Sequence, residues 1–366
     1  MERTAVKKRI NSLTGLRFWM IMIIVLSHLT CLRGNYPYSS FYNRYLHNAT
    51  MGVDFFFMLS GFGMMYSFRE SNVPTSIRGG YYFAIVRIKK IYPVYIASLM
   101  VCIPYDFIRS LGKGYTIMET VRNILIKLTF CVTLLQSAAG MEALDRGLNN
   151  VCWFLSSLFM IYLISPYMMK MMNKVKDRWI KAVFAGTVCL TMFAFYLFTS
   201  IQNISFFDDL NYGSPYFRAL FVLMGMVLER VYEQRKDNTS KYNNYEYVIV
   251  PGAVVWFFCR NQFKEYLYIC RLIDILLCAL LLLVVALGSG KIVHFLSRKR
   301  SIMLGNISMY IFIIHFPIIL YLDYFFDKSN IRVLLKDATG MIEAVLIVVS
   351  TGIIVSFLAR GKRGEK

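Results

Sequence analysis

Three long apolar runs without a charged residue constrain this chain more than any other feature. The runs 147–169, 182–207 and 302–322 are each long enough, as helices, to cross about 30 Å of hydrocarbon. Inside a bilayer the backbone must satisfy its own hydrogen bonds, which helices and closed barrels achieve. Hydrophobic residues make up 57% of the sequence, and the mean hydropathy is +0.51. We therefore predict an all-α fold, a polytopic transmembrane helical bundle.

About ten spans are expected, within a single domain that covers 1–366. One further apolar stretch, 124–135, is left over, and counting it as a span would place the basic segment 170–181 outside. We interpret it as interfacial or re-entrant, buried against protein. The approximate spans are 13–32, 49–67, 91–108, 151–170, 181–201, 216–232, 246–260, 272–288, 304–323 and 341–359.

The distribution of positive charge predicts the orientation of the chain. With the N-terminus inside, the inner segments carry 26 of the 41 Lys and Arg residues, and the outer segments carry 14, five of them in the connection 109–150. This bias follows the positive-inside rule and predicts that both termini are cytoplasmic. The same rule explains the net charge of +20 without nucleic acid as a partner.

Arg17 and His28 lie in the first predicted span and share one face of it. Eleven residues at about 100° each bring the two side chains to within roughly 20° of one another, about 16 Å apart along the helix axis. Such side chains are costly in lipid, so they should face protein, water or substrate. The pair therefore indicates a functional site, with Arg17 at the inner end and His28 toward the outside.

His28 is the candidate general base, because a neutral imidazole can take a proton from a hydroxyl near neutral pH. Asp54 opens the second predicted span, where an antiparallel neighbour would reach a similar depth, and it could orient the imidazole as in a catalytic triad. Each has a structural alternative: a histidine hydrogen-bonded between helices, and an aspartate capping its helix. His315 lies deep in another apolar run, where it either packs beside Pro317 or lines the site.

Arg87 and Lys90 precede the third predicted span and, three residues apart, share a helix face. With Arg17 they could form an inner positive cluster suited to phosphate groups. An ordinary positive-inside cluster would explain the same residues. The sequence has no spacing typical of metal ligands and no phosphate-binding glycine loop, so we expect no metal and no bound cofactor.

Five short blocks stand out along the chain: 13–17 (LTGLR) with His28, 51–62 (MGVDFFFMLSGF), 87–93 (RIKKIYP), Trp153 to Pro166 (WFL, with Tyr162), and 307–317 (ISMYIFIIHFP). In this order they resemble the membrane acyltransferase 3 family, integral membrane enzymes that O-acetylate bacterial surface sugars. The resemblance extends over nearly the whole chain. Three positions depart from the family pattern: Thr14 replaces Asp, Lys90 replaces Arg, and Leu158 stands where many members carry Glu.

The resemblance implies an O-acyltransferase that moves an acyl group, acetyl or alternatively succinyl, from cytoplasmic acyl-CoA to a hydroxyl of a surface or lipid-linked glycan. Acyl-CoA would be a donor substrate held by Arg17, Arg87 and Lys90. Trp153 and His315 would line the acceptor site. The resemblance also implies a multi-pass protein of the bacterial inner membrane. An exporter or flippase for a polysaccharide intermediate is the alternative, because a basic polytopic protein suits that role too.

Overall fold

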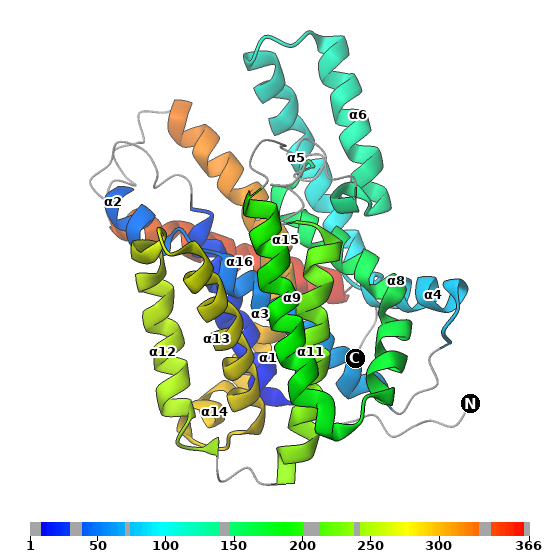
Figure 1. Ribbon diagram of the computed structural model, residues 1–366. Coiled ribbons are helices and arrows are strands. Elements are labelled where there is room, and N and C mark those ends of the chain that lie inside the picture. Colours follow the sequence, from blue (N-terminus) through cyan, green and yellow to red (C-terminus); the bar gives the residue numbers. More distant parts are fainter. Residues whose placement is uncertain are drawn as a thin grey trace.

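The computed structural model describes residues 9–29, 39–69, 74–138, 147–200, 213–237, 242–328 and 338–361. Within these ranges every regular element is helical, as the sequence predicts (Figure 1). The α-helices are α1 (Asn11–Ser27), α2 (Ser39–Phe41), α3 (Thr50–Phe68), α4 (Ile77–Ile88), α5 (Tyr92–Gly112), α6 (Ile117–Thr133), α8 (Trp153–Lys174), α9 (Ile180–Ser200), α11 (Pro215–Arg235), α12 (Glu246–Cys259), α13 (Leu267–Leu287), α14 (Lys291–Leu296), α15 (Lys299–Lys328) and α16 (Ala338–Gly361).

Each of the ten predicted spans falls largely on a helix. Several of these helices are long and apolar, as in a multi-pass membrane protein. α1 and α12 are shorter, with 17 and 14 residues, and α11 contains buried charged side chains. Six helical segments among the described residues satisfy both length and hydropathy for a membrane span: Tyr42–Phe68, Tyr92–Gly112, Asn150–Lys174, Asp177–Ser200, Leu267–Leu287 and Lys299–Tyr324.

The helix of the first predicted span, α1, ends at Ser27, before the predicted boundary at residue 32. The last carbonyl groups of a helix lack partners within it and are satisfied by other groups. Here the Ser27 carbonyl oxygen accepts hydrogen bonds from the Tyr42 hydroxyl at 2.6 Å and from Nδ1 of His47 at 3.0 Å. These contacts come from the π-helix Tyr42–Leu46 and from His47 directly after it. They hold the end of α1, where His28 is the C-cap residue.

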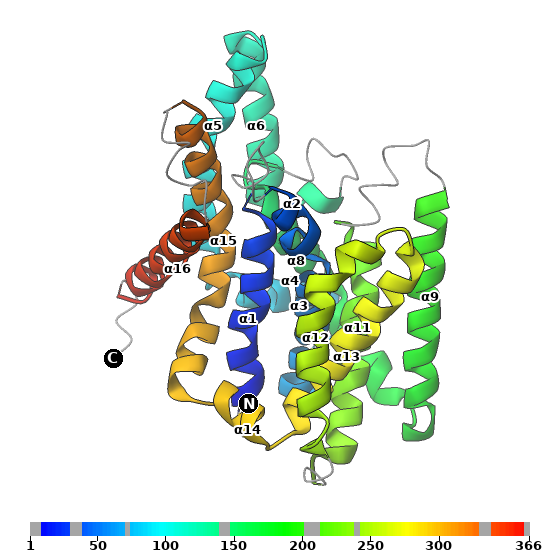
Figure 2. The same ribbon diagram turned by 90° about the vertical axis from the view of Figure 1, so that its left-hand side faces the viewer.

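The segment 124–135 differs from the prediction. It belongs mainly to α6, a regular helix that pairs with α5, and the two project together beyond the rest of the bundle (Figures 1 and 2). Burial against protein is wrong for much of it, because Leu125 is 56% exposed and Ile126 is 44% exposed. The face of α6 that is turned toward α5 is covered by that helix. There the Tyr95 hydroxyl donates to the Cys131 carbonyl at 2.8 Å.

Polar contacts fix the α5–α6 hairpin at the start of α6 and between its two helices. Thr116 and Glu119 form a capping box at the start of α6. Hydrogen bonds from the Thr116 backbone N–H and hydroxyl lower the pKa of the Glu119 carboxyl. Between the helices, Nζ of Lys127 lies 2.9 Å from Oδ2 of Asp106. The hairpin is therefore a defined structural element of the molecule.

Glycine residues allow α3 and α11 to approach closely. A Cβ on Gly61 would lie 1.9 Å from the Val222 carbonyl oxygen, and a Cβ on Gly225 would lie 1.8 Å from the Met58 carbonyl oxygen. Small residues at membrane helix contacts let backbones meet in this way. The contact fixes α3, which carries Asp54, against α11.

Candidate active site

His28 and His315 come together from opposite ends of the sequence. Nδ1 of His28 lies 3.4 Å from Nε2 of His315, and the ring centroids are 5.2 Å apart. The two residues belong to α1 and α15, which run side by side (Figure 2). His315 is fully buried, whereas His28 is partly exposed. The two histidines that the sequence singled out separately therefore form one pair.

Carbonyl contacts assign the protons of this pair. Nδ1 of His28 lies 2.8 Å from the Ile24 carbonyl oxygen, and Nδ1 of His315 lies 2.6 Å from the Phe312 carbonyl oxygen. A carbonyl oxygen only accepts, so in the neutral rings both Nδ1 atoms carry hydrogen. Nε2 of His315 is then an acceptor that faces the Nδ1–H of His28. The basic nitrogen of His28 is Nε2.

The helix pair that carries the histidines packs closely through a glycine. A Cβ on Gly305 in α15 would lie 1.8 Å from the Thr14 carbonyl oxygen in α1, nearer than any real contact. Next to this contact, a Cβ on Gly15 would lie 2.0 Å from the Leu296 carbonyl oxygen in α14 and 3.1 Å from Cβ of Ser301 in α15. Both contacts lie toward the Arg17 end of α1. They fix α1 against α15 and so support the histidine contact further along.

Helix α15 presents three faces near His315. Ile314, Pro317 and Ile318 follow one another at helical spacing and line an apolar cavity. Phe316 and Leu320, four residues apart, line a polar pocket. At about 100° per residue, His315 points roughly 90–120° away from each of these two directions, and it meets His28 on that third face. Helix α15 thus carries His315 on one face and lines two cavities of different chemistry with its others.

The apolar cavity lies between α5, α15 and α16 and has a volume of about 760 Å³. Its walls are mainly the apolar side chains of these helices, and Lys90 lines it from the turn between α4 and α5. Arg87 belongs to α4, so the prediction that Arg87 and Lys90 share one helix face is wrong. Val101, 11 residues further along, lines it too, so the cavity follows α5 for about 16 Å. A slender, largely apolar chain with a negatively charged end fits this arrangement.

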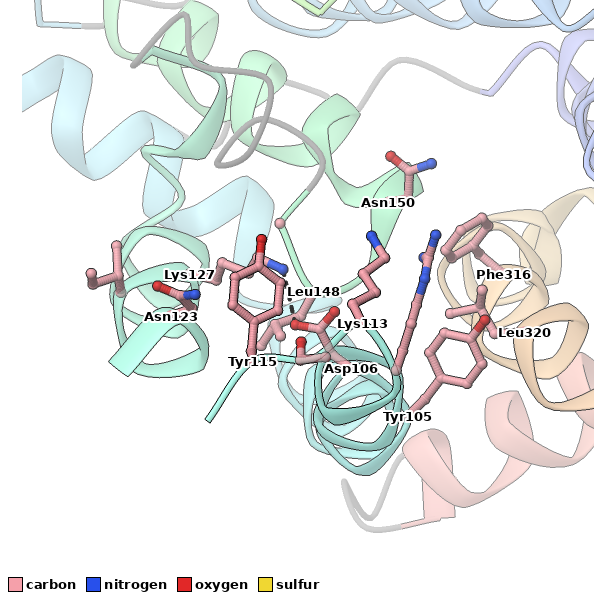
Figure 3. A pocket seen from close by; sticks show the side chains of 14 residues that line it. Tyr105, Asp106, Lys113, Tyr115, Asn123, Lys127, Leu148, Asn150, Phe316 and Leu320 are labelled. Carbon is pink, nitrogen blue, oxygen red and sulfur yellow. Dashed lines mark hydrogen bonds and ion pairs between the residues drawn. The ribbon is translucent and has the colours of Figure 1, made fainter. Parts of the chain in front are cut away.

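The polar pocket has a volume of about 600 Å³ and lies between the α5–α6 hairpin and α15 (Figure 3). Tyr105 and Lys113 from α5 face Phe316 and Leu320 from α15 across it. The Phe316 ring also meets the His28 ring edge-on, with centroids 6.0 Å apart. Phe316 therefore lies both in the pocket lining and against the partly exposed histidine.

Asp54 has different partners from the one expected. Its Oδ1 accepts from Nη1 of Arg218 at 2.6 Å, and its Oδ2 accepts from Nη1 of Arg271 at 2.6 Å. Nη2 of Arg271 lies 3.3 Å from Oδ1. All three side chains are buried. Among the described contacts, the carboxylate thus pairs with two arginines, and His315 takes the place beside His28 that the triad hypothesis gave to Asp54.

Trp153 belongs to the surroundings of this charged group. The guanidinium of Arg218 lies over the Trp153 ring at 5.5 Å and over the Phe57 ring at 5.4 Å, which places the charge between π-faces. The neighbouring Phe154 contacts Phe312 at 5.3 Å between centroids. Phe312 in turn contacts His315 at 5.8 Å. A chain of aromatic rings therefore connects the Trp153 region to the histidine pair.

Arg17 and Arg87 both lie near Tyr162. The guanidinium of Arg87 lies between aromatic rings, 5.2 Å from that of Tyr162, and Tyr162 also interacts electrostatically with Arg17. The Nε–H groups of both arginines are buried and have no hydrogen-bond partner among the described residues. A buried N–H group without a hydrogen-bond partner is costly. Two of the three predicted donor-site residues thus lie near one tyrosine, and each has such a group.

Arg218 and Arg271 are the residues that the sequence analysis missed. Arg218 lies inside a predicted span, and Arg271 directly precedes another. An arginine inside a predicted span is by itself a signal of a buried counter-charge. The charge count above assigns Arg218 to the outer segments, and so this signal is lost. In the described ranges, no group of three His, Cys, Asp or Glu side chains is placed to hold a metal ion.

Comparisons with known proteins agree with this architecture. The sequence profile of a family described as "Acyltransferase domain" matches residues 10–361. The acyltransferase MdmB of Streptomyces mycarofaciens is 26% identical over 191 residues, which is 50% of this chain and 46% of that protein. The match therefore covers less than half of that relative. No solved structure matches the chain.

Proposed function

This chain belongs to the acyltransferase 3 family of membrane acyltransferases, and we propose that it is an O-acyltransferase of a cell-surface or lipid-linked glycan. The acyl group, acetyl in the first place, comes from cytoplasmic acyl-CoA. No bound cofactor takes part, because acyl-CoA is a substrate. The protein resides in the bacterial inner membrane with both termini in the cytoplasm, and so the Arg17 end of α1 faces the cytoplasm.

The observation that supports this proposal most strongly is the histidine pair beside a helix that lines two unlike cavities. His28 Nδ1 and His315 Nε2 lie 3.4 Å apart, and α15, which carries His315, lines both the apolar cavity and the polar pocket. Acyl transfer needs a base that can meet a donor and an acceptor that enter separately. The histidine pair is the candidate for that base.

In the proposed reaction Nε2 of His28 takes the proton from the acceptor hydroxyl as its oxygen attacks the thioester carbonyl carbon. The carbon–sulfur bond then breaks, and the departing thiolate receives the proton back from His28. While His28 is protonated, its Nδ1–H is shared between the Ile24 carbonyl at 2.8 Å and Nε2 of His315 at 3.4 Å, and both acceptors stabilise the imidazolium. The step needs no covalent enzyme intermediate. A general base contributes typically 10²- to 10⁴-fold to a rate.

The donor site follows from the charges at the other end of α1. Arg17 and Arg87 bind the phosphate groups of acyl-CoA through their guanidinium groups, which both lie near Tyr162. Lys90 lies at the start of the apolar cavity, which receives the pantetheine arm and leads along α5 toward the residues that flank His315. Asp54 serves a structural role in this account, since it holds two buried arginines together.

The test is mass spectrometry of surface glycans from cells that make the wild-type protein, the His28→Ala variant, or no protein. We expect one extra acyl unit on the glycan in wild-type cells alone. His28→Asn provides a second variant of similar size, should the alanine reduce the amount of protein. Equal acylation in all three strains, with glycan accumulating inside the deletion strain, would instead identify an exporter.

A further inference from the structure

The polar pocket carries positive charge that the membrane orientation of the bundle does not explain. The outer connection 109–150 carries five Lys and Arg residues, which runs against the positive-inside rule in the orientation proposed above. Three of them, Arg109, Lys113 and Lys127, line the pocket. Positive charge gathered against the general bias indicates a local function.

Pairing within the pocket leaves two of these charges available. Lys127 is neutralised by Asp106, with 2.9 Å between Nζ and Oδ2 (Figure 3). Arg109 and Lys113 are exposed and have no hydrogen-bond or ion-pair partner among the described residues. Four residues apart, they share one face of α5. The pocket therefore presents two net positive charges on one wall.

The rest of the lining suits a carbohydrate. Tyr105 and Tyr115 offer aromatic faces, against which the apolar face of a sugar ring can pack. The amide groups of Asn123 and Asn150 can both donate to and accept from hydroxyl groups. Phe316 connects the pocket to the ring of His28. A sugar bound here can therefore place a hydroxyl near the proposed base.

We propose that the polar pocket binds the acceptor glycan and selects a sugar that carries a negatively charged group, a carboxylate or a phosphate, through Arg109 and Lys113. The charged group lies against the last turns of α5. The sugar ring lies between the tyrosines, and the reacting hydroxyl points toward His28. This inference rests on the proposed acyltransferase function, because it assigns the acceptor of that reaction.

The experiment measures equilibrium binding of three sugar probes to the full-length protein in lipid nanodiscs. Methyl β-glucuronide carries a carboxylate, glucose 1-phosphate carries a phosphate, and methyl β-glucoside is the matched neutral sugar. We expect at least one charged probe to bind about tenfold more tightly than the neutral sugar, as charge-assisted hydrogen bonds do. The charged probe that binds more tightly identifies the anionic group of the acceptor.

Variants locate the preference. Arg109→Gln with Lys113→Gln should bring the charged probes to the affinity of the neutral one, and Lys113→Arg should keep most of the preference. Arg122→Gln is the matched control, because Arg122 is exposed on the same hairpin outside the pocket. Equal binding of all three probes to the wild type, or a preference that survives the double substitution, would overturn the proposal.

The same measurements separate this inference from the acyltransferase function. His28→Ala should bind the charged probe as the wild type does, because binding needs no base. A preserved preference in a wild-type protein that transfers no acyl group would contradict the function alone. Acyl transfer without any preference for charge would contradict the pocket assignment alone.

Discussion

Nε2 of His315 lies 3.4 Å from Nδ1 of His28, although the two residues are 287 positions apart in the chain. Because the hydrogen-bonded carbonyls place hydrogen on both Nδ1 atoms, the Nδ1–H of His28 donates first to the Ile24 carbonyl, and Nε2 of His315 is a second, more distant acceptor of the same hydrogen. In the proposed reaction His315 would help to stabilise a protonated His28. The pair would then work as a base and its orienting partner, which in other enzymes is a carboxylate.

Non-additive kinetics should reveal that the two histidines act together. We expect His315→Gln to slow acyl transfer roughly ten- to a hundredfold, and the double variant with His28→Ala to be no slower than His28→Ala alone, since residues that act as a unit are not additive. The transfer rate to glycan in membranes of each strain is the measurement. His294→Gln is the control, because His294 is exposed on α14. Losses that multiply in the double variant would mean that the histidines act separately.

The close contact at Gly305 gives a second prediction. A Cβ there would lie 1.8 Å from the Thr14 carbonyl, so Gly305→Ala should push α1 from α15 and cost about 1–3 kcal/mol of stability. Acyl transfer should fall with it, because the histidine contact depends on this packing. Thermal unfolding and transfer rate are measured together.

A matched glycine checks that this effect comes from the contact. A Cβ on Gly186, inside α9, would meet nothing within 4 Å. Gly186→Ala should therefore be neutral or slightly stabilising, as is usual for this change in a compatible helix. If Gly305→Ala and Gly186→Ala behave alike, the contact between α1 and α15 has little importance for activity.

The Asp54 group should respond as a buried ion cluster. One carboxylate and two guanidinium groups leave one net positive charge, and Asp54→Asn raises it to two. Breaking a buried pair costs about 3–5 kcal/mol, so the variant should lose stability and yield. Adding Arg271→Gln restores the original net charge and should recover part of the stability. A single variant that folds normally but loses only its rate would instead return Asp54 to the chemistry.

The donor site predicts a difference between two substitutions of Arg17. Arg17→Lys keeps the charge and should raise the KM for acyl-CoA less than Arg17→Ala, which we expect to raise it at least tenfold by removing a charge-assisted contact. Steady-state kinetics with varied acyl-CoA provide the test. Arg178→Ala, an exposed arginine, is the control. Wild-type KM values in both Arg17 variants would remove Arg17 from the donor site.

Much of the fold could be predicted because hydrophobic runs report directly on helices in a membrane. The segment 124–135 was the exception, since an apolar run alone does not say how much of it another helix covers. α6 packs against α5 along one side, and Leu125 stays exposed. The predicted end of the first span at residue 32 is also wrong for α1, which ends at Ser27. Contacts from Tyr42 and His47 to the Ser27 carbonyl end the helix there.

The residues of the candidate site were easier to predict than their partners. His28, His315 and Asp54 could each be recognised as unusual in an apolar segment. Which of them meet depends on helix packing, which a single sequence does not encode locally. His28 therefore pairs with His315, while Asp54 pairs with Arg218 and Arg271.

The most direct test of the central claim is the rate of acyl transfer from labelled acetyl-CoA to glycan, catalysed by the purified protein added back to membranes from cells that lack it. His28→Ala should reduce this rate by about 10²- to 10⁴-fold, the contribution of a general base. The amount of folded protein, measured in parallel, should stay the same. A His28→Ala variant that transfers acyl groups at the wild-type rate would contradict the account.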